Sequence, residues 1–231
     1  MESSATNFVR VDDEPLHVQR WKSADFRLVD VQFPPHTTSL WHQHVHYGVY
    51  IAITPIVATE QSVHDAAPKA LHKKRGEVFC RDHTKDRLTH VVSTSEEPMR
   101  IIEVELVRDE RHLAVDVVLP PHVHRSIVQL HEDERCRVHR ITLLRETAEA
   151  SSIQLVLPTD AVLVALDDCS VNVTNPTADD KIHADHARLL KGESHAMKRG
   201  DDVTLVAGTF TLRGTAFDDQ GVAAFILTEV F

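Results

Sequence analysis

Two histidines one residue apart, His42 and His44, are the residues of this sequence best placed to do chemistry. In an extended strand, side chains two positions apart point to the same face. The β-branched and aromatic run at 49–53, which follows the pair, is typical of a strand. Two neutral imidazoles on one face of a strand can hold one transition-metal ion. His46 extends this face if the strand stays regular.

A metal site needs a further ligand, and His90 is the preferred candidate because it leads into a β-branched, strand-like segment. His83 is the rival, but no strand-like segment follows it. His122 and His124 repeat the spacing of the first pair. Two prolines precede them in what reads as a linker, and spacing without strand context is a weak signal. We therefore expect the metal ligands to be His42, His44 and His90.

Most of the 17 histidines have no such context. His183 and His186 lie in a polar stretch that we interpret as a solvated loop. Six others have no partner at metal-binding spacing: His17, His64, His72, His112, His131 and His139. We interpret them as surface residues or hydrogen-bonded core residues.

The elements that must position these side chains are almost all strands. Short segments rich in Val, Ile, Leu and Thr alternate with turn signals built on Gly, Pro and Asp. No long amphipathic helix is visible. Many short strands at fairly regular spacing predict a sandwich or barrel. The expected strands are 26–33, 89–93, 100–107, 138–143, 152–157, 161–166, 171–173, 203–206 and 223–227.

The sequence also repeats itself over a long period. Residues 74–78, with the sequence KRGEV, reappear as KRGDDV at 198–203. The strand-like segment at 28–33 likewise resembles 138–143, and the order of the repeated segments is the same in both halves. Such a duplication favours two similar domains over a solenoid. We expect a first domain at 1–112, a linker at 113–134 and a second domain at 135–231.

Composition limits the possible functions. The 231-residue chain has a formal net charge of −10 and an apolar content of 42%, enough to build a core. An acidic chain without a run of basic residues argues against nucleic-acid and membrane-surface partners. No apolar run is long enough for a transmembrane helix, and residues 1–6 lack the features of a signal peptide. The three widely spaced cysteines read as buried reduced thiols. We therefore expect a cytoplasmic protein.

These motifs together resemble those of the cupins. The pair His42 and His44 matches the centre of the first cupin motif, and His90 matches the histidine of the second. The carboxylate of the first motif is missing, because Gly48 or Val49 stands at its position. The resemblance covers nearly the whole chain and implies a bicupin: an all-β protein of two tandem jelly-roll barrels.

The resemblance implies one divalent transition metal per chain, with iron first and nickel, zinc, manganese or copper as alternatives. Cupin dioxygenases with three histidines and no glutamate suggest a mononuclear iron dioxygenase that acts on a small chelating metabolite, such as a diketone, enediol or thiol. Tyr50 or His46 would orient the substrate or move a proton. A non-catalytic ligand-binding cupin and a zinc or nickel isomerase or lyase are the alternatives.

The C-terminal half is expected to keep the fold and lose the site. The segments that match the metal-binding strands, 152–156 and 210–212, contain no histidine. This half is therefore expected to be structural, or to form a homodimer.

Overall fold

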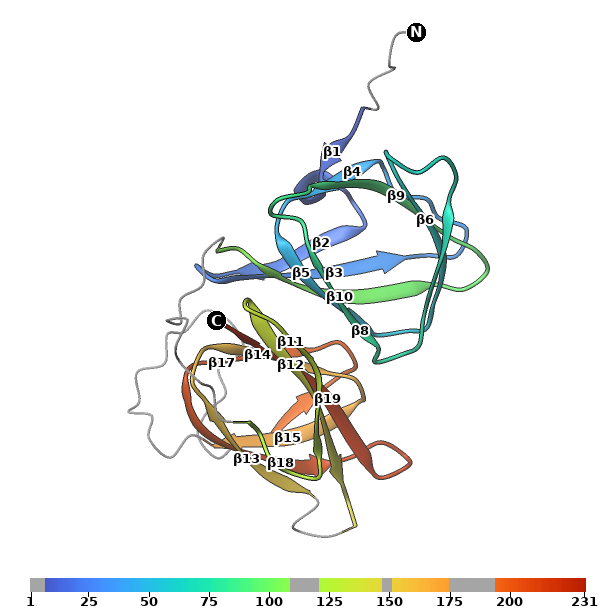
Figure 1. The fold of residues 1–231 in the computed structure, drawn as a ribbon. Helices are drawn as coiled ribbons and strands as arrows, with labels where there is room; N and C mark the ends of the chain where they lie inside the picture. The colour runs from blue at the N-terminus through green and yellow to red at the C-terminus, as the bar shows by residue number, and fades with distance from the viewer. Residues whose placement is uncertain (1–6, 109–120, 147–150, 175–193) are drawn as a thin grey trace, which may run out of the picture. The chain divides into compact units, whose positions relative to one another are not determined.

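A computed structural model of the chain describes residues 7–108, 121–146, 151–174 and 194–231. The chain separates into two compact units, Met1–Asp109 and Glu110–Phe231 (Figure 1). His112, His183 and His186 lie outside the described residues, as does part of the expected linker. Each unit is described by itself below.

The first unit is built from two five-stranded sheets, with the strand orders β1-β4-β9-β6-β7 and β2-β3-β10-β5-β8. A short 3-10 helix, Val11–Asp13, joins its first two strands. The strands are β1 (Val9–Arg10), β2 (His17–Lys22), β3 (Phe26–Phe33), β4 (His42–His44), β5 (Tyr47–Ala52), β6 (Ile56–Ser62), β7 (Lys69–Lys73), β8 (Val78–Asp82), β9 (Leu88–Thr94) and β10 (Met99–Leu106).

The second unit has a five-stranded sheet of order β11-β12-β19-β14-β17 and a four-stranded sheet of order β13-β18-β15-β16. The strands are β11 (Ile127–Glu132), β12 (Cys136–Leu144), β13 (Ser152–Leu157), β14 (Ala161–Ala165), β15 (Cys169–Thr174), β16 (Ser194–Met197), β17 (Asp202–Leu205), β18 (Gly208–Ala216) and β19 (Val222–Val230). Both sheets reproduce the strand order of the first unit, which has β1 in addition. The duplication predicted from the sequence is thus present in the topology.

The repeated sequence KRG forms the same turn in both units. Gly76 and Gly200 both have positive φ angles, of 72° and 86°, which glycine adopts without steric cost. Their amides donate to the carbonyls of Ala52 and Ala165, at 2.7 and 2.8 Å. One local sequence therefore connects matching strands in the two units.

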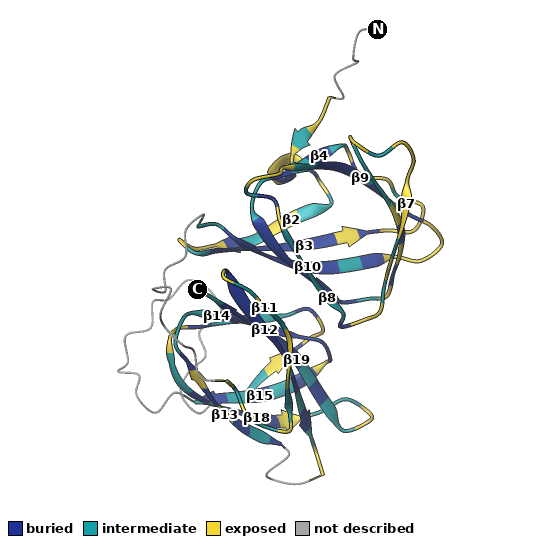
Figure 2. Cartoon of the chain, in the orientation of Figure 1, coloured by how far each residue is buried: buried dark blue, intermediate teal, exposed yellow. Residues whose placement is uncertain are grey.

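Most strands in each unit are buried on one or both faces (Figure 2). Apolar residues fill the inner face of the second unit, and Leu155, Leu163 and Phe225 are fully buried there. In the first unit the apolar core around Val31, Phe33 and Ile101 covers only part of the inner face. The remainder carries buried polar residues: His42, His44, His90, Glu103 and Glu105. The first unit therefore has a polar region inside its apolar core, and this region holds the candidate functional site.

The strands expected at 26–33 and 152–157 have the predicted bounds. The segment expected to be a linker contains β11, which pairs with β12. His46 lies in a bend between β4 and β5, so it does not continue the strand of His42 and His44. Within the described residues, no cysteine forms a disulfide; Cys136 and Cys169 are buried as expected, whereas Cys80 is only partly buried. No helix in this part of the chain is long and apolar enough to span a membrane.

Candidate metal centre

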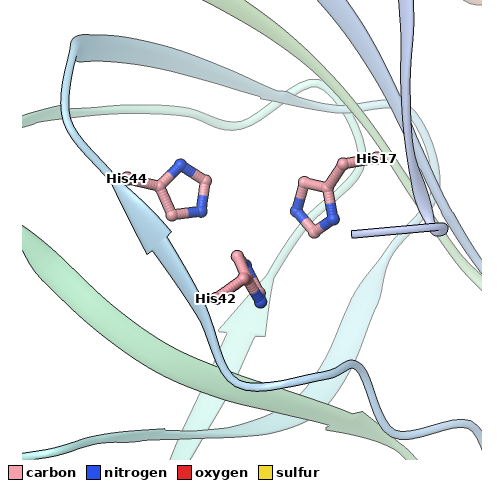
Figure 3. Close-up of side chains that lie close together, drawn as sticks. All are labelled: His17, His42 and His44. Atoms are coloured by element: carbon pink, nitrogen blue, oxygen red, sulfur yellow. The ribbon is translucent and has the colours of Figure 1, made fainter. Parts of the chain in front are cut away.

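Four buried histidines from three strands meet inside the first unit. His42 and His44 share one face of β4, and His90 of β9 is the direct cross-strand partner of His42. His17 joins them from the start of β2. Its ring centroid lies 4.6 Å from that of His42 and 5.8 Å from that of His44 (Figure 3). The rings of His42 and His90 are 4.5 Å apart, and those of His44 and His90 are 5.0 Å apart.

Three of these rings are oriented by an oxygen atom next to Nδ1. His17 Nδ1 lies 2.6 Å from Glu14 Oε2, and His42 Nδ1 lies 2.8 Å from the carbonyl oxygen of Leu40. His90 Nδ1 lies 2.7 Å from Glu60 Oε1. An acceptor at Nδ1 places the proton of a neutral imidazole there and leaves a lone pair on Nε2. Partners of this kind are typical of histidines that bind a metal through the other nitrogen.

The Nε2 atoms of His42 and His90 lie 3.0 Å apart. In the tautomers set by Leu40 and Glu60, both atoms carry lone pairs, so nothing bonds them directly. Burial and the neighbouring imidazoles lower the pKa of His42 to about 3. Burial lowers the pKa of His90 to about 4 against the opposing effect of Glu60. Both imidazoles are therefore neutral at pH 7, and their lone pairs are available to a cation.

A second layer of charge holds His90 in place. Both Glu60 oxygens accept hydrogen bonds from the Arg81 guanidinium, and the Nη2–Oε2 distance is 2.9 Å. Despite its burial, these bonds and the one to His90 hold the pKa of Glu60 well below its usual value. Glu60 is thus a fixed negative charge behind the ring, which raises the basicity of His90 as a ligand.

His17 is the site residue that the sequence analysis missed. It has no partner at metal-binding spacing along the sequence and is hydrogen-bonded to Glu14, but β2 also brings its ring against His42. His83, the rival to His90, is also buried and lies with its ring centroid 5.7 Å from that of His44. His17, His83 and His90 come from parts of the sequence far from the pair His42 and His44, and the fold brings them to it.

Tyr50 lies beside this cluster. Its hydroxyl is 3.5 Å from His44 Nδ1, and its ring stacks on Phe79 at a centroid distance of 4.9 Å. Burial, the nearby charges of Glu103 and Glu105 and a hydrogen bond to Glu103 raise the pKa of Tyr50 well above its usual value. Tyr50 therefore remains protonated and available as a hydrogen-bond donor.

Gly48 and Val49, the two residues expected at the position of the motif carboxylate, point to opposite faces of β5. Gly48 and Tyr50 share the inner face of β5, because they are two residues apart. A Cβ atom on Gly48 would lie 2.7 Å from the Tyr50 ring. The tyrosine ring thus fills the space in which a side chain at position 48 would begin.

Two carboxylates that the sequence analysis did not single out approach His44 from β10. Glu103 Oε1 lies 3.4 Å and Glu105 Oε1 lies 3.9 Å from His44 Nδ1. Glu105 is also paired with the Arg27 guanidinium, at 2.6 Å between Nε and Oε2. Burial and the charge of Glu103 raise the pKa of Glu105 to about 7. His44 therefore lies between the histidine cluster and a buried acid pair.

A small cavity of about 40 Å³ opens beside these groups. Its polar lining includes His44, His90, Tyr50 and Glu103, and its walls are largely apolar. The space suits a ligand of a few heavy atoms that has an apolar part and a few polar contacts.

The second unit has apolar residues where the first has its histidines. On β13 and β18 the buried side chains are Ile153, Leu155, Leu157, Phe210 and Leu212. A different polar cluster lies on β12 and β19, where the Arg137 guanidinium binds both oxygens of Glu229, at 2.9 and 3.0 Å. His122 Nε2 lies 3.1 Å from Glu229 Oε2. The guanidinium already neutralises this carboxylate, so we interpret the cluster as structural.

Comparisons with known proteins address the fold. No known family profile matches this sequence, and no curated protein matches it at a significant level. Among solved structures, a cupin 2 conserved barrel domain protein from Leptotrichia buccalis matches 93% of this chain and 88% of its own length, with a TM-score of 0.51 and 11% identity. AerE from Microcystis aeruginosa matches 94% of this chain and 98% of its own, with a TM-score of 0.56 and 9% identity.

The formate complex of Lactobacillus farciminis oxalate decarboxylase matches 92% of this chain and 79% of its own, with a TM-score of 0.59 and 9% identity. At these identities the likeness concerns the architecture and leaves the chemistry to be argued from the site. The strand order, the buried histidines of the first unit and these structural matches lead to one conclusion: the chain has the cupin fold.

Proposed function

We propose that this protein is a mononuclear metal-dependent cupin that acts on a small chelating metabolite. His42, His44 and His90 are the proposed metal ligands, and His17 supplies a further imidazole. The observation that carries the proposal is the approach of the His42 and His90 Nε2 atoms to 3.0 Å, with both lone pairs facing each other. A metal cation bound by both nitrogens would remove the repulsion between their lone pairs and form a coordinate bond to each. Neutral imidazoles suit Fe, Ni, Cu and Zn better than Mg or Ca.

The charge of the proposed metal ligands indicates which substrates the bound metal would favour. Imidazoles add no negative charge, and Gly48 supplies no carboxylate. A divalent ion bound only by imidazoles keeps its full charge, which favours anionic bidentate ligands. Enediolates, diketonates and thiolates have this character. Iron held in this way would supply oxygen activation, so we propose a dioxygenase reaction on such a ligand.

The protein's own side chains have separate parts in this reaction. Glu60 and the Leu40 carbonyl fix the His90 and His42 rings, so that the ligand nitrogens keep their direction. The Tyr50 hydroxyl, which stays protonated, donates a hydrogen bond toward a substrate oxygen in the cavity. The apolar walls exclude water, which strengthens the charge interactions inside.

Oxygen consumption tests this proposal. Metal-free protein is loaded with Fe(II) under anaerobic conditions and mixed with a β-diketone, an enediol or a small thiol in air. We expect oxygen uptake with one of the three classes and no uptake by an equally loaded sample of the His42→Ala variant. Metal binding without oxygen uptake or product would instead indicate a non-catalytic ligand-binding cupin.

One observation favours a second candidate, an isomerase or lyase that needs no oxygen. Such a reaction requires an acid or base near the substrate, and Glu103 lies beside the cavity within reach of Tyr50 and His44. Turnover of an enolisable hydroxyketone by the Zn- or Ni-loaded protein without oxygen would favour this candidate. Turnover only with iron and oxygen would exclude it.

A further inference from the structure

Glu103 is a buried carboxylate whose oxygens have no hydrogen bond of good geometry among the described residues. Its side chain is inaccessible to solvent, and the hydroxyl of Tyr50, a neutral donor beside it, can serve only one of its two oxygens. The nearest ring nitrogen of His44 lies 3.4 Å from Oε1 and is itself 3.5 Å from the Tyr50 hydroxyl. Even a reoriented His44 could satisfy only one of the two Glu103 oxygens.

Three other carboxylates inside the first unit each have a histidine or arginine partner. Glu14 accepts from His17 and from the amides of Leu16 and Leu40. Glu60 is bound by Arg81 and His90. Glu105, like Glu103, has no hydrogen bond of good geometry, but unlike Glu103 it forms an ion pair with Arg27, which also contacts Asp12. Because the two nearby guanidiniums are committed to Glu60 and Glu105, Glu103 is left without a cation of its own.

An unmatched carboxylate in such a position is costly. Burying a polar group without a hydrogen bond costs roughly 1–3 kcal/mol, and more if the group is charged. Buried groups of this kind are rare in folded proteins, and they mark places where a ligand, water or ion completes the bonding. Glu103 also faces the cavity that touches His44 and His90, whereas Glu105 does not line it. The missing donor should therefore come from a molecule in the cavity.

We propose that Glu103 recognises a cationic or hydrogen-bond-donating group, an ammonium above all, on the small molecule that binds at the histidine cluster. This inference rests on the proposed function and specifies its substrate class. The ligand would have a chelating anionic head at the imidazoles and an ammonium or hydroxyl group at Glu103. A cavity of about 40 Å³ limits the part of the ligand that it encloses to a few heavy atoms.

A matched pair of probes tests the recognition step. Lactate and 3-amino-2-hydroxypropanoate both offer a carboxylate and a 2-hydroxyl group, and they differ in an ammonium group at carbon 3. Each is titrated into Co(II)-loaded protein, and the visible absorption of cobalt reports binding. We expect the ammonium probe to bind about tenfold or more tightly than lactate, because a charge-assisted hydrogen bond is made at Glu103.

Three variants separate the possible outcomes. In Glu103→Gln the preference for the ammonium probe should fall to threefold or less, with Co(II) affinity unchanged. Glu105→Gln, which changes the neighbouring carboxylate, and Glu77→Gln, which changes an exposed one, should keep the preference. Equal binding of the two probes by the unchanged protein would overturn the inference, as would a preference retained in Glu103→Gln. Loss of Co(II) from Glu103→Gln would make Glu103 a metal ligand and would overturn it as well.

A second measurement needs no metal and is independent of the proposed function. If the Glu103 carboxylate is unmatched in the ligand-free protein, replacing it with an apolar side chain should stabilise the fold. The melting temperature of metal-free Glu103→Met should then rise by about 2–8 °C. A lower melting temperature would show that the fold itself satisfies Glu103, and the inference would fail. If the unchanged protein binds no Co(II), the proposed metal function fails, and a rise in melting temperature would still support Glu103 as a ligand-recognising group.

Discussion

Gly48 and Tyr50 occupy one space inside the first unit: a Cβ atom added to Gly48 would lie 2.7 Å from the Tyr50 ring. Stacking on Phe79 holds the ring in place, at a centroid distance of 4.9 Å. The first prediction is that Gly48→Ala lowers the free energy of unfolding by about 1–3 kcal/mol, because overpacking forces the ring to move. Urea denaturation of the single variant and of Gly48→Ala combined with Tyr50→Ala checks it. A double variant that fails to recover part of the loss relative to Tyr50→Ala alone would contradict it.

The second prediction concerns a glutamate placed at position 48, where the Tyr50 ring occupies the space of the side chain. Gly48→Glu alone should bind metal no better than the unchanged protein, since the Tyr50 ring blocks the side chain. Gly48→Glu with Tyr50→Ala should bind metal more tightly than Tyr50→Ala, because the carboxylate adds a negative ligand. Val49→Glu is the control: it faces away from the site and should leave metal affinity unchanged in the folded fraction. Equal metal affinity in Tyr50→Ala with and without the glutamate would refute the assignment of Gly48 to the motif position.

Glu60 gives the third prediction. Glu60→Gln removes the charge behind His90, and metal affinity should fall about 10- to 100-fold. Competition of the loaded protein against a metal-binding dye measures this change. Glu77→Gln is the matched control, because Glu77 pairs with Lys73 at the surface of the same unit, at 2.7 Å. An unchanged affinity in Glu60→Gln would mean that His90 binds no metal through Nε2.

The fourth prediction is a loss of stability in mild acid. In the fold the pKa values of His42 and His90 are about 3 and 4, below the usual 6.5, mainly because burial disfavours the charged ring. Below pH 6.5 the unfolded chain takes up protons at these residues that the folded chain does not, so unfolding becomes more favourable. The metal-free protein should therefore be most stable above pH 6.5 and lose stability steadily down to about pH 4.

Urea midpoints measured across this pH range, with and without Zn(II), check the sign. Zinc should raise the midpoint most near neutral pH and lose its effect in acid, because protons and metal compete for the same nitrogens. His42→Leu should flatten the dependence of the metal-free protein. The raised pKa of Glu105, about 7, acts in the opposite direction in both proteins, so the same pH dependence in His42→Leu and in the unchanged protein would rule out the low pKa of His42.

The second unit gives the fifth prediction. Arg137 and Glu229 form a buried pair, so Glu229→Gln leaves the guanidinium unmatched and should cost about 3–5 kcal/mol of unfolding free energy. Metal content of the folded protein should not change, because the proposed site lies in the first unit. Calorimetry with elemental analysis of the same samples measures both quantities. A bound ion lost together with Glu229 would place a metal in the second unit.

Much of the fold could be predicted from the sequence. Strands such as Phe26–Phe33 follow from β-branched composition and turn residues, and their bounds are those expected. The duplication is visible because the turns at Gly76 and Gly200 need the same positive φ angle, which keeps the same local sequence. His42, His44 and His90 could be grouped because strand alternation fixes one pair and the motif spacing suggests the third.

The rest of the site depends on contacts that spacing does not encode. His17 lies 25 residues before His42 and reaches it only through the pairing of separate strands. Glu103 and Glu105 alternate with apolar residues, a pattern that normally places charges in solvent. β10 lies between β3 and β5 and is buried on both faces, so here the alternation points charges inward. His46 was expected to share the face of His44, and the bend before β5 removes it from the strand.

Elemental analysis of protein purified without added metal tests the central claim most directly. The account predicts about one transition-metal ion per chain in the unchanged protein, with none retained after dialysis in His42→Ala, His44→Ala or His90→Ala. The control His122→Ala, in the second unit, should retain the ion. Full occupancy in the His42→Ala and His90→Ala variants, or no metal uptake by the unchanged protein when Fe, Ni, Zn, Mn or Cu is supplied, would contradict the account.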